Sequence, residues 1–244
     1  MPIFERTTAT GPVALHYEIS GSGFPILAIA PGGMRSAIPF WDNAPWNPVT
    51  GLADTFQVIA MDQRNAGQST GPVTAADGWN DFRADQLALL DHLGVERCHV
   101  VGMCIGGSYG LGLIEAAPER IAAAVLYQPI GLDGNRDAFF AMFDDWAAAL
   151  KPERADVSDA AWDAFKHRMY DGDFVFNLDR DAVARLRTPL LIPMGEDLYH
   201  PRSISEAIVA LVPAAELLPS WKTGADVAAA EGRVRAFLGR HTPA

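Results

Sequence analysis

The segment CHVVGMCIGGSYGLGLIEAAP, residues 98–118, decides the fold of this chain. Its first six residues have strand length and character, and the residues after Cys104 suit a helix that ends before Pro118. Glycines stand two residues before and two residues after the cysteine, at Gly102 and Gly106. Small residues are needed there when a strand turns sharply into a helix and the central residue takes a strained backbone conformation. The segment therefore predicts a strand, a tight turn and a helix, with the Cys104 thiol held beside the helix N-terminus.

The two cysteines of the chain have different expected roles. A helix N-terminus lowers the pKa of a nearby thiol below its free value of about 8.5, and the thiolate is the attacking form. Cys104 is therefore a candidate nucleophile, and the competing interpretation is an inert cysteine at a turn that has lost its function. Cys98 lies inside the expected strand and belongs to the core. Six positions of extended chain separate the two residues, which is beyond the reach of a disulfide, about 7 Å.

Short apolar runs alternate with amphipathic stretches along most of the chain. The runs have strand length and are bounded by Gly, Pro or Asp. Because fully apolar strands suit a parallel sheet covered on both faces, the pattern predicts an α/β fold with a doubly wound, mostly parallel sheet. Residues 13–20 alternate like an antiparallel edge strand. The expected parallel strands are residues 25–30, 56–62, 98–103, 122–127, 189–195 and 215–219, and the expected helices are residues 81–94, 106–117, 203–212 and 226–240.

One interval, residues 131–187, contains no convincing strand. Two helices fit it instead, at residues 135–150 and 158–170. Open α/β sheets bind ligands at the carboxyl edge of their strands, so an insertion between two strands can cover a site there. We expect a helical cap or lid, and the alternative is that these helices only pack on the sheet.

Composition and charge limit the partners and the location of the chain. With 244 residues, of which 49% are hydrophobic and 20% charged, residues 1–244 are expected to form a single domain with a sizeable core. A net charge of -11 without a basic cluster argues against nucleic acid and against an anionic membrane surface. We expect a small-molecule substrate, with a homodimer left open. The N-terminus lacks the pattern of a signal peptide and no run is long enough to span a membrane, so a cytoplasmic location is expected.

Several motifs together resemble those of the α/β-hydrolase fold superfamily. The G-M-C-I-G turn resembles its nucleophile elbow, with Cys104 in place of the usual serine. Residues 31–33, Pro-Gly-Gly, resemble the loop that helps to hold an oxyanion. The resemblance implies backbone N–H donors at Gly33, Met34 and Ile105. Residues 61–70, MDQRNAGQST, resemble a structural turn of the superfamily in which an arginine ties loops together, and the matching residues are Asp62, Arg64, Gly67 and Ser69.

The resemblance also implies an acid and a base, and the base departs from the family pattern. The segment PLLIPMGEDLYHPRS, residues 189–203, resembles the strand and loop that carry the acid, which makes Asp197 the expected acid and Glu196 the fallback. The superfamily places its histidine shortly after the last strand, where this chain has LLPSWKTG, residues 217–224, without a histidine. Three alternatives for the base remain open, namely His200 in the acid loop, Lys222 near the vacant position and His167 in the cap.

These residues define a functional hypothesis and its alternatives. A cysteine at the elbow, with Asp197 and His200 as acid and base, indicates a hydrolase or acyl transferase that acts on a small ester, thioester or lactone through an acyl-enzyme. The missing histidine supports the alternative of a catalytically inactive homologue that binds a small apolar ligand or a partner protein. A lyase or isomerase is a third option, because fold does not settle function. No metal and no organic cofactor is implied.

Overall fold

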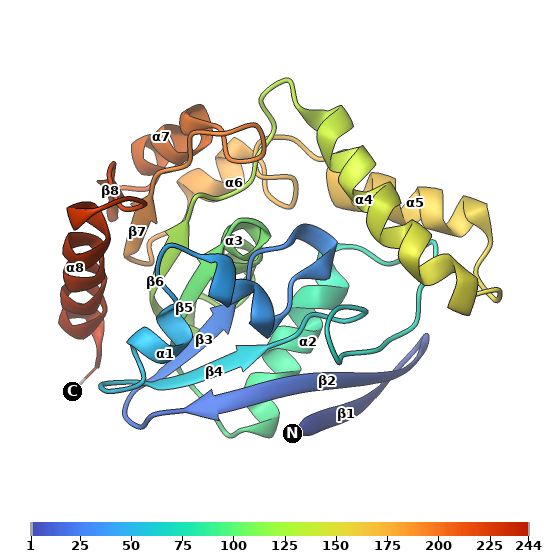
Figure 1. Ribbon diagram of the computed structural model, residues 1–244, viewed down its shortest axis with the longest axis horizontal. Coiled ribbons are helices and arrows are strands. Elements are labelled where there is room, and N and C mark those ends of the chain that lie inside the picture. The colour runs from blue at the N-terminus through green and yellow to red at the C-terminus, as the bar shows by residue number, and fades with distance from the viewer. Residues whose placement is uncertain (1, 244) are drawn as a thin grey trace.

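Eight strands form one sheet in the computed structural model of the chain, which describes residues 2–243 (Figure 1). Their order across the sheet is β1-β2-β4-β3-β5-β6-β7-β8. β2 pairs antiparallel with both β1 and β4, and all other neighbours are parallel. The strands are β1 (Ile3–Thr8), β2 (Gly11–Ser20), β3 (Pro25–Ile29), β4 (Gln57–Met61), β5 (Cys98–Met103), β6 (Ile121–Tyr127), β7 (Leu190–Pro193) and β8 (Ala215–Leu218).

The six apolar runs of the sequence become the six parallel strands, β3 to β8, so the predicted fold class is confirmed. The prediction of an edge strand at residues 13–20 was wrong in its position. β2 is antiparallel as expected, but β1 pairs along its outer side and forms the edge. β1 was missed because its side chains alternate between exposed and half-buried, so the hydrophobic signal of the segment IFERTT is weak.

Helices cover both faces of the sheet, and the buried apolar residues form two clusters accordingly. α2, α3 and α7 contribute to one cluster, and α8 contributes to the other. Neighbouring residues of β3 show the division, since Leu27 belongs to the first cluster and Ala28 to the second. The helices on the sheet are α1 (Pro48–Gly51), α2 (Trp79–His92), α3 (Ile105–Ala116), α7 (Arg202–Leu211) and α8 (Ala225–His241), with short 3-10 helices η1 (Gly33–Arg35), η2 (Ile38–Asn43) and η3 (Pro118–Arg120).

The interval between β6 and β7 is helical, as predicted. α4 (Arg136–Leu150) and α5 (Asp159–Tyr170) pack side by side at the upper right of Figure 1, joined through η4 (Lys151–Glu153), and α6 (Arg180–Ala184) follows them. α6 was not predicted, because five residues are too few for a helical period. We call residues 131–187 the cap.

Tryptophan side chains attach the cap to the rest of the chain. Trp146 on α4 donates a hydrogen bond from Nε1 to the carbonyl of Asn65 at 3.2 Å, and Trp79 on α2 donates one to the carbonyl of Met169 at 2.7 Å. Motion of the cap as a lid stays a prediction. Among residues 2–243, no helix has both the length and the apolar character that crossing a bilayer requires.

Candidate active site

Cys104 lies in the tight turn between β5 and α3, as the glycine spacing predicts. Its backbone has φ 61° and ψ -119°, a strained conformation for a residue with a side chain. A Cβ atom on Gly102 would lie 2.2 Å from the carbonyl oxygen of Gly106, and one on Gly106 would lie 2.3 Å from that of Ile29. Real Cβ atoms essentially never approach so closely. The two glycines are therefore required for the turn, which leaves Cys104 half-buried at the N-terminus of α3.

The loop after β7 brings Asp197 and His200 together. His200 Nδ1 lies 2.7 Å from Asp197 Oδ1, and because a carboxylate only accepts, Nδ1 carries the proton. The same oxygen accepts the backbone N–H groups of Tyr199 and His200, at 3.0 and 3.1 Å. Gly195 allows the loop to be this tight, since a Cβ there would lie 2.4 Å from the carbonyl oxygen of His200. The loop thus fixes the orientation of the imidazole ring through its own backbone.

The second ring nitrogen of His200 faces the nucleophile position. His200 is buried, with an exposed fraction of 9%, and its Nε2 makes no hydrogen bond of ordinary length and angle with any described residue. Its imidazole and the Cys104 thiol interact electrostatically. Nε2 is therefore free to exchange a proton with the thiol or with a bound molecule.

The ionisation of the three groups is coupled. Burial raises the pKa of the Cys104 thiol, but attraction of the thiolate to His200 outweighs burial, so this pKa is lowered. Burial lowers the pKa of His200, but the neighbouring Cys104 and Asp197 raise it more, so the net shift is upward. Burial raises the pKa of Asp197, and its hydrogen bond with His200 lowers it below its usual value. These directions favour a thiolate beside an imidazolium that a carboxylate orients.

Backbone N–H groups complete the surroundings of the sulfur. Hydrogen bonds with the backbone of Gly32 and of Ile105 help to lower the pKa of the thiol. Ile105 was predicted as an N–H donor. Gly32 was missed, because two consecutive glycines do not reveal which amide faces the nucleophile. Gly33 and Met34 follow directly, Met34 is buried, and their assignment as donors stays a prediction.

Residues 217–224, where the sequence resemblance places a histidine, contribute Trp221 to the core. Trp221 is buried there, donates from Nε1 to the carbonyl of Met194 at 2.9 Å and packs its ring 5.0 Å from that of Tyr127. The ammonium of Lys222 lies over the Trp221 ring at 5.4 Å. His167, the cap alternative, pairs with Asp171 at 2.9 Å near the surface. Of the three alternatives for the base, His200 is the one whose ring interacts with Cys104.

The structural turn at residues 61–70 has the role that the sequence predicts. Arg64 is buried and donates from Nε to Asp85 of α2 at 2.6 Å. Asp62 accepts the N–H of Ile38 at 2.7 Å, and Asn65 takes a positive φ of 60°. This turn therefore fixes the loops near the site to α2.

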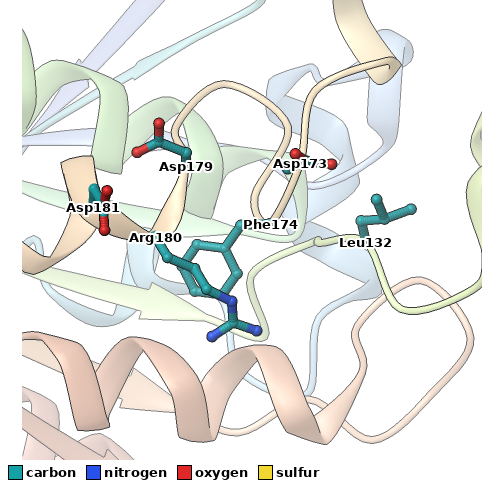
Figure 2. Close-up of a pocket in the computed structure, with 6 residues that line it drawn as sticks. All are labelled: Leu132, Asp173, Phe174, Asp179, Arg180 and Asp181. Carbon is teal, nitrogen blue, oxygen red and sulfur yellow. The ribbon is translucent and has the colours of Figure 1, made fainter.

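A separate surface pocket of about 420 Å³ lies at the end of the cap, near α6 (Figure 2). The guanidinium of Arg180 lies over the ring of Phe174 at 4.5 Å, and Phe174 has a positive φ of 52°. Within the described chain, no group of three or more His, Cys, Asp or Glu side chains is arranged to hold a metal ion, here or elsewhere. The pocket has none of the predicted site residues in its lining, which consists of Leu132, Asp173, Phe174, Asp179, Arg180 and Asp181.

Comparison with known proteins agrees with this architecture. Residues 31–211 match the family described as alpha/beta hydrolase fold, and the chain belongs to that family. A protein of Azorhizobium caulinodans, provisionally named carbamate hydrolase RutD, is 37% identical over 116 residues, which is 48% of this chain and 41% of that protein. Carboxylesterase YbfK of Bacillus subtilis is 24% identical over 218 residues, covering 78% of this chain and 70% of the relative. The crystal structure of a hydrolase from Pseudomonas aeruginosa PA01 aligns with a TM-score of 0.71 at 26% identity, covering 97% of this chain and 98% of that one.

Proposed function

We propose that this chain is a hydrolase in which Cys104 is the nucleophile and water releases the acyl group. The observation that carries the proposal is the arrangement of three groups, with the elbow thiol beside His200 and Asp197 2.7 Å from His200 Nδ1. A nucleophile next to a base that a third group orients is the general signature of nucleophilic catalysis. The lowered pKa of the thiol adds to it, because the thiolate is the reactive form.

In the first half of the proposed reaction, the Cys104 thiolate attacks the carbonyl carbon of the substrate. A carbon–sulfur bond forms and the carbonyl electron pair moves to oxygen, where the N–H groups of Gly32 and Ile105 stabilise the negative charge. The imidazolium of His200 then gives its Nε2 proton to the leaving oxygen as the carbon–oxygen bond breaks. A thioester on Cys104 and a neutral imidazole remain.

In the second half, His200 acts as a base. Its neutral Nε2 accepts a proton from a water molecule while the water oxygen attacks the thioester carbonyl. The carbon–sulfur bond breaks, the product acid leaves, and the thiolate again faces an imidazolium. Asp197 keeps the Nδ1 proton in place throughout, which fixes the tautomer of the ring. An alcohol or amine in place of water would make the same steps an acyl transfer.

The cap favours a small substrate. Met142 on α4 lies directly over the oxyanion loop, because a Cβ on Gly33 would lie 2.5 Å from its sulfur. Relatives in the family are named for carbamate and carboxylester hydrolysis. We therefore propose a small ester, thioester or lactone as the substrate of this chain.

Intact-protein mass spectrometry tests the proposal. The protein is mixed with p-nitrophenyl acetate and quenched at early times. We expect one acetyl group, mapped to Cys104 by digestion, and its slow loss in parallel with steady-state release of nitrophenol. Cys104→Ala should take up no acetyl group, whereas Cys98→Ala, altered at the buried cysteine, should behave as the wild type.

Two results would contradict the proposal. One is acetylation of Cys104→Ala at the wild-type rate, and the other is a wild-type protein that never carries the group on Cys104. His200→Ala should slow both halves, because the thiol loses the group that lowers its pKa and the attacking water loses its base.

A further inference from the structure

Two buried phenol groups near the nucleophile have no partner. Tyr109 on α3 has an exposed fraction of 2%, and Tyr170 at the end of α5 has 0%. The hydroxyl of each makes no hydrogen bond with residues 2–243. A buried hydroxyl without a partner destabilises a fold, so such groups call for a specific reason. A ligand that accepts hydrogen bonds from both would supply one.

Ring contacts and electrostatics place the two tyrosine side chains near each other and near Cys104. Tyr109 follows Cys104 by five residues on α3, about 7.5 Å along the helix axis. Trp79 contacts both rings, with centroid distances of 5.1 Å to Tyr109 and 6.4 Å to Tyr170. The two tyrosines interact electrostatically with each other and with the nucleophile. Tyr109 belongs to α3 and Tyr170 to the cap, so a ligand that reached both hydroxyls would lie between α3 and the cap.

A row of aromatic rings in contact runs from Tyr170 to His200. Tyr170 stacks on Phe139 at 5.3 Å, and Phe139 meets Tyr199 at 5.4 Å. Tyr199 in turn lies 6.5 Å from the His200 ring. The leaving group of the proposed reaction must lie beside His200, which protonates it. Tyr170 stands at the other end of this row of rings and Tyr109 contacts the same Trp79, so the part of the substrate that stays on the sulfur would extend toward them.

The charge of the neighbourhood selects the kind of acceptor. Burial and the nearby Tyr170 raise the pKa of Tyr109, and burial and the Cys104 charge raise that of Tyr170. Both phenols therefore remain protonated donors. Arg64 also acts on Tyr109, but its charge is paired with Asp85, so the thiolate would repel a carboxylate at this place and would not repel a neutral oxygen.

We propose that Tyr109 and Tyr170 bind a neutral oxygen acceptor, such as a keto oxygen, in the acyl part of the substrate. This inference rests on the proposed cysteine hydrolase and names its substrate class as oxo-acyl esters or lactones. A site built to donate hydrogen bonds discriminates against an analogue that lacks the acceptor, because its own polar groups are then left unpaired.

Two esters of one shape test the proposal. p-Nitrophenyl levulinate and p-nitrophenyl isocaproate differ only in a keto oxygen that a methyl group replaces. We expect the wild type to have the higher kcat/KM for the levulinate ester, with each of Tyr109→Phe and Tyr170→Phe reducing this preference about fivefold. kcat/KM for the isocaproate ester should rise in both variants, because the phenol hydroxyl that this ester leaves unpaired has been removed. Tyr127→Phe is the matched control, because it removes another buried, unpartnered phenol hydroxyl on the opposite face of the sheet.

The outcomes separate this inference from the proposed function. Equal turnover of both esters through an adduct on Cys104, or an unchanged preference in both Phe variants, overturns the inference alone. Absence of any adduct with either ester overturns the proposed function and the inference with it. If circular dichroism shows that a Phe variant does not fold, the test uses the wild type alone. Inhibition of the wild type by levulinamide is then compared with its inhibition by isocaproamide. Stronger inhibition by levulinamide supports the subsite, and equal inhibition overturns it.

Discussion

Replacement of Asp197 by asparagine tests the core of the proposed mechanism with little change of shape. Asp197 Oδ1 accepts three hydrogen bonds, from His200 Nδ1 and from the backbone N–H groups of Tyr199 and His200. The amide oxygen of asparagine can accept the same three. The variant Asp197→Asn therefore keeps the loop and removes mainly the negative charge that stabilises the imidazolium.

The size of the effect follows from the geometry. A hydrogen bond to a charged partner contributes about 1.5–3 kcal/mol and a neutral one about 0.5–1.5 kcal/mol. The Asp197 side chain is 49% exposed, so solvent screening puts the difference at the lower ends of these ranges, about 1 kcal/mol. This corresponds to a loss of about fivefold in kcat/KM. Because Asp197 raises the pKa of His200, the variant should also shift the alkaline limb of the pH profile to lower pH.

The assay is the hydrolysis of p-nitrophenyl acetate across a pH series, with Glu196→Gln as the matched control. Glu196 is the exposed neighbouring carboxylate and the alternative acid from the sequence. We expect the control to keep the wild-type rate and pH profile. An unchanged rate in Asp197→Asn, or an equal loss in Glu196→Gln, would refute the assignment of the acid.

Iodoacetamide should alkylate Cys104 at a lower pH than a free thiol, because the pKa of Cys104 is lowered. In His200→Ala, the midpoint of the alkylation rate against pH should move to higher pH. A midpoint that His200→Ala leaves unchanged would contradict the interaction between Cys104 and His200. Gly106→Ala should lower the Tm by roughly 2–12 °C, because its Cβ would lie 2.3 Å from a carbonyl oxygen. Gly232→Ala, at an exposed position of α8, should raise the Tm by about 2–4 °C, because alanine favours the helix more than glycine does. Thermal unfolding of both glycine variants measures the predicted fall and the predicted rise in Tm. Lys222→Met should leave kcat/KM unchanged, and a loss as large as that of His200→Ala would make Lys222 the base.

The sequence predicts the parallel strands and the elbow because local physics decides them. Fully apolar runs of strand length have few alternatives to a covered sheet. The requirement for glycine around Cys104 is also local, since the turn excludes any side chain at Gly102 and Gly106. β1 and α6 escape prediction because one alternates weakly and the other is too short.

The geometry of the site depends on contacts that a linear pattern does not contain. Asp197 and His200 were both candidates, because residues 189–203 resemble the acid-bearing loop of the superfamily and His200 lies in that loop. The choice among His200, Lys222 and His167 needed the fold, which shows the first beside Cys104 and the other two engaged elsewhere. No sequence signal places Tyr170 of the cap beside Tyr109 of α3, because sixty residues of chain lie between them.

Asp197 and His200 occupy opposite ends of one four-residue turn, closed by paired backbone hydrogen bonds of 3.2 Å between them. The turn itself therefore aligns Asp197 with His200, and this alignment does not depend on where the flanking strand and helix lie. In the proposed mechanism, the carboxyl-terminal strand and helix, β8 and α8, therefore do not have to hold a proton carrier. We expect the turn to keep its geometry when it is moved as one piece onto another sheet of the same family.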